Sequence, residues 1–180
     1  MLFRSRPAII ALDAPQGLPG VGRTRRAADA QARTPTSALP ADRTALATWK
    51  AYRAFIEAGI EIFWAVHKSG GSVDGLGAGT GPLFCETYPR YVLRRLWPEL
   101  EIPSKRKAPL AYVDAVWSRL KAAGFSCDST LRPCLDHVDA MLCALAAERS
   151  VDDLPPGTVG DPPVVDADER VIREGYIVAP

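Results

Sequence analysis

The sequence predicts an α/β protein, in which strands and helices alternate along the chain. The apolar run at residues 7–12 has no polar alternation, which is typical of a strand buried in a sheet that is covered on both faces. A second strand is predicted at residues 83–89, and helical periodicity fills much of the remaining sequence. A chain of 180 residues is long enough for one domain with its own core, so we expect a single domain over residues 1–180.

Two helices are predicted between these strands. Pro15, Gly17, Pro19, Gly20 and Gly22 break the chain after the first strand, and a helix is expected over residues 24–33. Residues 43–66 form the longest helical pattern, because aromatic and aliphatic side chains recur three or four residues apart. This stripe is interpreted as a core face, with a stacking platform for nucleic-acid bases as the alternative. Its members are Trp49, Tyr52, Phe55, Ile56, Ile60, Phe63 and Trp64.

The segment before the second strand is rich in glycine. Residues 69–82 hold six glycines, but their spacing is not GxGxxG and they precede a strand instead of joining a strand to a helix. We therefore expect a flexible loop here and not a phosphate-binding one. The strand that follows contains Glu86 and is stopped by Pro89.

The second half of the chain is predicted to be mainly helical. Helices are expected at residues 90–97, at 108–123 before Gly124, and from Pro133 to Arg149. Residues 150–163 are rich in proline, glycine and aspartate and are interpreted as a linker. Residues 171–178 are expected to form a short strand, or a hairpin that turns at Glu174 and Gly175.

Composition excludes several classes of protein. No apolar run approaches the roughly 20 residues that span a bilayer, and the start of the chain does not resemble a secretory signal, so a cytoplasmic protein without membrane contact is expected. The four cysteines form no CxxC pair and suit reduced thiols better than a zinc site. Net charge changes along the chain, from +6 over residues 1–53 to −6 over residues 108–180.

Four acidic residues are candidates for a site. Asp13 ends the first strand, where open α/β sheets place their ligands, although it could instead cap a turn or pair with an arginine. Asp136 and Asp139 lie in the first turn of the helix at residues 133–149. At 100° per residue Asp139 is on the rim of the apolar face and Asp136 is nearer to solvent, and both could simply stabilise the helix dipole. Glu86 lies among apolar neighbours and needs either a cation or an arginine.

The pattern of these residues resembles the family called domain of unknown function 429, whose members are often described as predicted nucleases of ribonuclease H fold. The resemblance rests on "AIIALDAPQGLP", "RTRRAADAQAR", "FCETYPR", and "LDHVDAMLCALAA" followed by "EGYIVAP", in that order. It implies a ribonuclease H-like mixed sheet flanked by helices. The family's opening strand, with its first aspartate, has no counterpart here. We therefore expect an N-terminally truncated fold with an exposed sheet edge that favours a homodimer or poor solubility.

The resemblance also implies a function. We expect a metal-dependent nuclease with two Mg²⁺ or Mn²⁺ ions, in which Asp13 and Asp139 bind metal and Asp136 or Glu86 completes the set. Basic residues would position nucleic acid through its phosphates; they are Arg26, Arg33, Lys105 and Lys107. The alternatives are a non-catalytic interaction protein with the same fold and a small-molecule enzyme such as a phosphatase.

Overall fold

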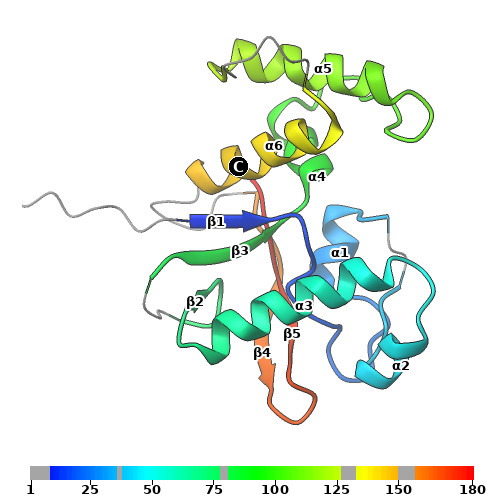
Figure 1. Ribbon diagram of the computed structural model, residues 1–180, viewed down its shortest axis with the longest axis vertical. Coiled ribbons are helices and arrows are strands. Elements are labelled where there is room, and N and C mark those ends of the chain that lie inside the picture. Colours follow the sequence, from blue (N-terminus) through cyan, green and yellow to red (C-terminus); the bar gives the residue numbers. More distant parts are fainter. Residues whose placement is uncertain (1–8, 36–37, 78–80, 127–132, 150–156) are drawn as a thin grey trace, which may run out of the picture.

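A mixed five-stranded sheet lies at the centre of the molecule, which confirms the predicted α/β class (Figure 1). The computed structural model describes residues 9–35, 38–77, 81–126, 133–149 and 157–180. The strands are β1 (Ile9–Leu12), β2 (Ser72–Val73), β3 (Leu83–Thr87), β4 (Val159–Asp166) and β5 (Val171–Val178). Their order is β1-β3-β5-β4, with β2 also paired to β3. β1, β2 and β5 are parallel to β3, and β4 is antiparallel to β5.

β1 lies at the edge of the sheet formed by the described residues, as the expected exposed edge has it, although its apolar run alone predicted a strand in the middle of the sheet. It pairs with β3 from Ile9↔Leu83 to Leu12↔Glu86, and no other described strand pairs with it. None of its four residues is fully buried, and Ile10 is 36% exposed. An apolar run reports the side chains on both faces of a strand but says nothing about whether its backbone has a neighbour on each side. That limit explains the error.

Helices cover both faces of the sheet (Figure 1). They are α1 (Ala27–Ala32), α2 (Arg43–Thr48), α3 (Arg53–Lys68), α4 (Pro89–Leu96), α5 (Pro109–Ala122) and α6 (Leu135–Arg149). One core joins α1, α4, α5 and α6 to the end of β5, and α3 packs with α2 and β5 on the opposite side. Within the described parts of the chain, no helix is both long enough and apolar enough to cross a membrane.

The long helix predicted at residues 43–66 is in fact two helices. α2 ends at Thr48, before Trp49, whose backbone is extended, and α3 begins after Tyr52, whose φ is +54°. No proline or glycine marks the break, so its position could not be predicted locally. Trp49 packs against the core beneath α2 and α3, and this tertiary contact fixes the change of direction. The aromatic stripe is thereby divided into buried and exposed members.

The C-terminal segment differs from its prediction as well. β4 begins at Val159, inside the segment predicted as a linker, while residues 150–156 lie outside the described part of the chain. Pro162 and Pro163 fall at a register shift between Asp161 and Val164, where a strand tolerates proline because a ladder hydrogen bond is already lost. The hairpin turns at residues 167–170, and Glu174 and Gly175 lie within β5. β2 was likewise missed within the glycine-rich loop.

Candidate functional site: a carboxylate groove beside an aromatic cavity

Asp13 follows β1 directly and lies between two hollows of the surface. One is a groove of about 490 Å³ between β1 and α6, and the other is a cavity of about 280 Å³ beside α3. The segment after Asp13 is held close to α3 at Gly59, where a Cβ atom would stand only 2.6 Å from the Pro15 carbonyl oxygen. The close approach of helix and loop fixes the position of the carboxylate.

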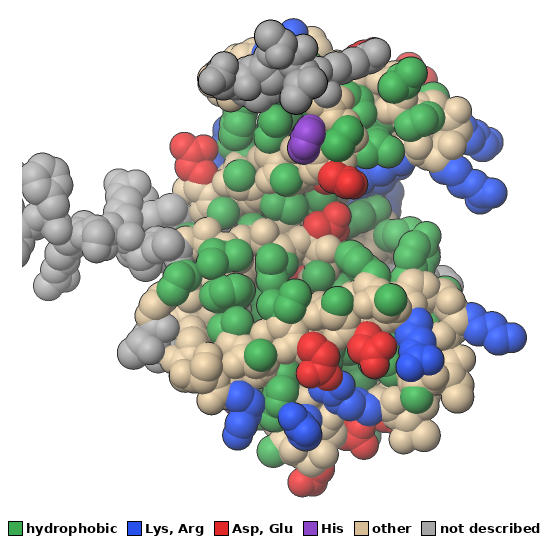
Figure 2. Space-filling model, in the orientation of Figure 1, with side chains coloured by type: hydrophobic (Ala, Val, Ile, Leu, Met, Phe, Trp, Pro, Cys, Tyr) green, Lys and Arg blue, Asp and Glu red, His purple; other side chains and the backbone are tan. Residues whose placement is uncertain are grey.

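The groove brings together three of the predicted acidic residues. Asp13, Asp136 and Asp139 all line it, the first from β1 and the others from α6. Figure 2 shows acidic side chains among apolar ones in this region, between the surfaces of α6 and α3. The side chain of Asp139 is only 17% exposed, whereas Asp136 is an exposed residue. Asp139 is therefore the more buried acid and Asp136 the more exposed one, as the helical spacing predicted.

Asp139 already has two partners. The Lys105 ammonium group forms an ion pair with its Oδ2 atom, and the Tyr112 hydroxyl donates a hydrogen bond of 3.0 Å to Oδ1. The Lys105 Nζ atom also lies 5.0 Å from the centre of the Tyr112 ring. The basic loop before α5 thus places a positive charge beside Asp139, and the predicted contact of Lys105 with nucleic-acid phosphate stays a prediction.

The pKa of Asp13 is raised from its ordinary value of 3.8 to about 6. Loss of hydration is the main cause, the nearby Asp139 carboxylate adds to it, and Lys105 acts in the opposite direction. The residue is nevertheless open to solvent, so water screens part of this effect. Cys143 lines the same groove, and burial raises the pKa of its thiol to about 12, so it stays protonated at neutral pH.

Glu86 has an arginine partner, which decides between the two possibilities left open by the sequence. Both of its carboxylate oxygens accept hydrogen bonds from Arg26, at 2.6 and 2.7 Å, and the Gln16 backbone N–H donates a further one at 2.6 Å. Arg26 also binds Asp29 at 2.8 Å. Burial disfavours the charged form of Arg26, but Glu86 and Asp29 more than compensate, so the pKa of Arg26 is raised. Glu86 is thus assigned to a buried network and not to a catalytic group.

The structure contradicts the prediction that Arg26 contacts nucleic acid. Its side chain is 0% exposed and its guanidinium nitrogens are bound to Glu86 and Asp29, so it is not available to nucleic-acid phosphates. An arginine in a basic cluster looks the same in sequence whether it faces water or a buried carboxylate, and that ambiguity caused the error. Arg33 ends α1 in the left-handed region at φ 52° and is exposed. Lys107 is exposed in the loop before α5.

The metal set implied by the resemblance fits only in part. Among the residues that the structure describes, no group of three or more histidine, cysteine, aspartate or glutamate side chains is placed to hold a metal ion. These residues do not form a two-metal centre. Mg²⁺, however, commonly keeps several waters and binds one or two carboxylates together with substrate phosphate oxygens. Asp13 and Asp139 fit that smaller role.

Three residues of this region were not predicted as site residues. Tyr112 lies on α5, and only the packing of α5 against α6 brings it to Asp139. Tyr52 and Phe55 line the cavity beside Asp13, although both belong to the stripe that was interpreted as core. Within α3 Phe55 lies about 100° around the helix from the buried Ile56, a signal that helical geometry could have supplied, whereas Tyr52 lies before the helix.

The fold and this groove define a mixed α/β protein with a pair of carboxylates at the end of an edge strand. The chain belongs to the family described as "Protein of unknown function (DUF429)", whose model matches residues 1–163. This membership confirms the family that the sequence resembled. Neither a curated protein nor a solved structure matches the chain.

Proposed function

We propose that the protein is a metal-dependent nuclease that hydrolyses phosphodiester bonds in the groove between β1 and α6. The observation that supports this most strongly is the meeting of Asp13 and Asp139, which come from opposite ends of the chain to line one groove. Burial raises the pKa of Asp13, the Asp139 carboxylate raises it further, and a divalent cation would relieve the repulsion between the two carboxylates.

Each residue of the groove has a distinct part in this proposal. Asp13 and Asp139 would hold one Mg²⁺ or Mn²⁺ ion, and Asp136, at the exposed side, would orient a water molecule. When bound, the cation supplies positive charge to the phosphate and helps to ionise the attacking water. Lys105 would move from Asp139 to a phosphate oxygen of the substrate, because the cation takes over its role beside the carboxylate. Tyr112 would keep Asp139 in place.

A calorimetric titration with Mn²⁺ tests the proposal. The parent chain should bind Mn²⁺, and both Asp13→Asn and Asp139→Asn should weaken binding at least tenfold, since each removes one of only two charged ligands. Glu57→Gln, on the exposed face of α3, is the matched control and should bind as the parent does. Asp13→Asn and Asp139→Asn should also lose hydrolysis of a fluorescent single strand of nucleic acid, and Glu57→Gln should keep it. Equal Mn²⁺ binding by all four proteins would overturn the assignment.

The open edge of β1 favours a second function, that of an interaction protein. On its free side β1 faces the groove, where small side chains at Ala140, Ala144 and Ala147 leave room beside the backbone. We propose that β1 of a second copy pairs with this edge, because an unpaired apolar strand is a template for another strand. Sedimentation should show a dimer that Ile10→Lys dissociates. A parent chain that sediments as a monomer at all concentrations would contradict this pairing.

A further inference from the structure

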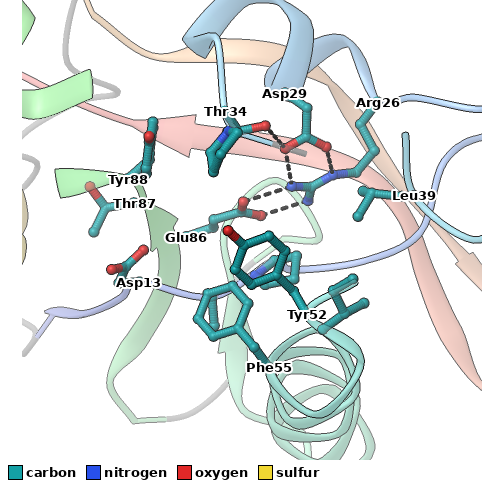
Figure 3. A pocket seen from close by; sticks show the side chains of 14 residues that line it. Asp13, Arg26, Asp29, Thr34, Leu39, Tyr52, Phe55, Glu86, Thr87 and Tyr88 are labelled. Carbon is teal, nitrogen blue, oxygen red and sulfur yellow. Dashed lines mark hydrogen bonds and ion pairs between the residues drawn. The ribbon is translucent and has the colours of Figure 1, made fainter. Parts of the chain in front are cut away.

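The second hollow beside Asp13 is a cavity between α3 and the ends of β1 and β3. Figure 3 shows its construction: the rings of Tyr52 and Phe55 rise from α3 on one side, and Glu86, Thr87 and Tyr88 lie on the other. Asp13 stands at the margin nearest to Thr87 and Tyr88. The volume of about 280 Å³ is close to the lower limit of small-molecule sites, about 300 Å³.

Tyr52, just before α3, and Phe55 of α3 are exposed, whereas the core-facing residues of α3 are not. Ile56, Ile60 and Phe63 on the same helix are at most 1% exposed, but Tyr52 is 60% exposed and Phe55 is 47% exposed. Tyr52 is also held at φ +54°, a conformation that costs free energy for a residue with a side chain. Two large rings at i and i+3 thus border a cavity without being buried by the protein itself.

The buried polar groups around the cavity already have partners. Arg26 satisfies both oxygens of Glu86, Asp29 accepts from Arg26 and from the Thr34 hydroxyl at 3.0 Å, and the Thr87 hydroxyl donates to the Val178 carbonyl at 2.8 Å. Such groups have little capacity left to recognise the edge of a ligand through hydrogen bonds. The cavity therefore offers stacking and apolar contact.

The position of Asp13 restricts what the cavity can hold. The same carboxylate lines both the cavity and the groove, where Asp139 and Lys105 lie. With a phosphate in the groove, as the proposed function has it, a ligand that occupies both hollows would carry a flat ring connected to that phosphate. A cavity of about 150 Å³ admits benzene, so about 280 Å³ leaves space for a one- or two-ring base.

We propose that this cavity binds one nucleobase of a single-stranded nucleic acid, stacked on Phe55 and Tyr52, while the adjoining phosphate lies in the groove at Asp13. The inference rests on the proposed nuclease function for the location of the phosphate. Because stacking accepts every base and the polar groups are already paired, purines and pyrimidines should both bind.

Calorimetry with three small ligands in the presence of Mn²⁺ tests the base site. Adenosine 5′-monophosphate should bind about 5- to 150-fold more tightly than ribose 5-phosphate, which corresponds to a stacking energy of about 1–3 kcal/mol per base. Uridine 5′-monophosphate should also exceed ribose 5-phosphate. Phe55→Ala should remove this advantage and leave ribose 5-phosphate binding unchanged. Ile62→Ala, an exposed position on the same helix, is the matched control and should change nothing.

A competition experiment tests whether the cavity takes its base from a single-stranded nucleic acid. A single strand of ten nucleotides should displace adenosine 5′-monophosphate from the parent chain, and failure to displace it would overturn the assignment to nucleic acid. Equal affinity for adenosine 5′-monophosphate and ribose 5-phosphate would overturn the base site itself. If the two ligands bind equally while Asp13→Asn still weakens Mn²⁺ binding, the base site fails and the proposed nuclease function stands. If the base advantage is present but Asp13→Asn and Asp139→Asn bind Mn²⁺ normally, the proposed nuclease function fails instead.

Discussion

Two carboxylates near the ends of neighbouring parallel strands have opposite surroundings. Leu12, the last residue of β1, pairs with Glu86 of β3, so Asp13 and Glu86 lie near the same edge of the sheet. Glu86 is 4% exposed and accepts three hydrogen bonds from Arg26 and Gln16. Asp13 is exposed, and the nearest charge that raises its pKa is another carboxylate, Asp139.

The difference distinguishes a structural charge from one that is available for chemistry. A buried carboxylate that is paired in this way holds its neighbours in place and has little capacity left for a ligand. A carboxylate that is partly dehydrated, beside a second one, is destabilised in its charged form and gains from any cation that binds. In this molecule the Glu86 network positions α1 against the sheet, and Asp13 faces the two hollows.

The largest effect is expected from Arg26→Met, which leaves Glu86 and Asp29 buried without their partner. The free energy of unfolding should fall by about 3–5 kcal/mol, the usual cost of breaking a buried ion pair. Urea denaturation followed by circular dichroism measures this loss. Arg53→Met removes one member of an exposed pair, with 3.7 Å between the Arg53 and Glu57 side chains, and should cost no more than about 0.5 kcal/mol. Similar losses in both variants would show that the Glu86 network is not a buried structural unit.

A smaller effect is expected from Tyr112→Phe, which removes one hydrogen bond from Asp139. The carboxylate keeps Lys105 and is partly exposed, so water can replace the hydroxyl and unfolding should become easier by only about 1 kcal/mol. Mn²⁺ affinity should also fall, because Asp139 loses the contact that orients it. A destabilisation as large as that of Arg26→Met would mean that Asp139 belongs to a structural network of the same kind.

The sequence was sufficient for much of the fold but for less of the site. The α/β class, β3, and the helices α4 to α6 follow from periodicity and from proline and glycine signals, which are local. The position of Asp139 on the rim of the apolar face of α6 followed from helical geometry, since α6 is long and regular. The edge position of β1 and the break before α3 depend on which segments pack together, and no local pattern reports that.

Partners of charged side chains were the hardest feature to predict. The burial of Arg26 against Glu86 joins residues 60 positions apart, and the ion pair of Lys105 with Asp139 joins residues 34 apart. Sequence gives the need for a partner but not its identity, because any arginine or cation would satisfy a buried acid equally well. The cavity at Tyr52 and Phe55 was missed for a related reason: stacking on exposed rings and packing of buried rings use the same spacing.

The last prediction concerns the titration of Asp13, which is the prediction most specific to the comparison. In the metal-free protein, carboxyl ¹³C NMR should give Asp13 a pKa of about 6. Asp139→Asn should lower this pKa because it removes a neighbouring negative charge, and Lys105→Met should raise it because it removes a positive one. Glu57→Gln, distant from the groove, should leave it unchanged.

The same titration predicts how stability varies with pH. The pKa of Asp13 in the folded state lies above its ordinary value of 3.8, so folding favours the protonated form. This contribution to stability is fully present below about pH 3.8 and is lost as the pH rises through about 6, and Asp13→Asn should remove that part of the pH dependence. A pKa near 3.8 that Asp139→Asn fails to move would show that Asp13 is fully hydrated and independent of Asp139. The contrast with Glu86 would then be one of solvent exposure alone, and a divalent cation would have no repulsion to relieve in the groove.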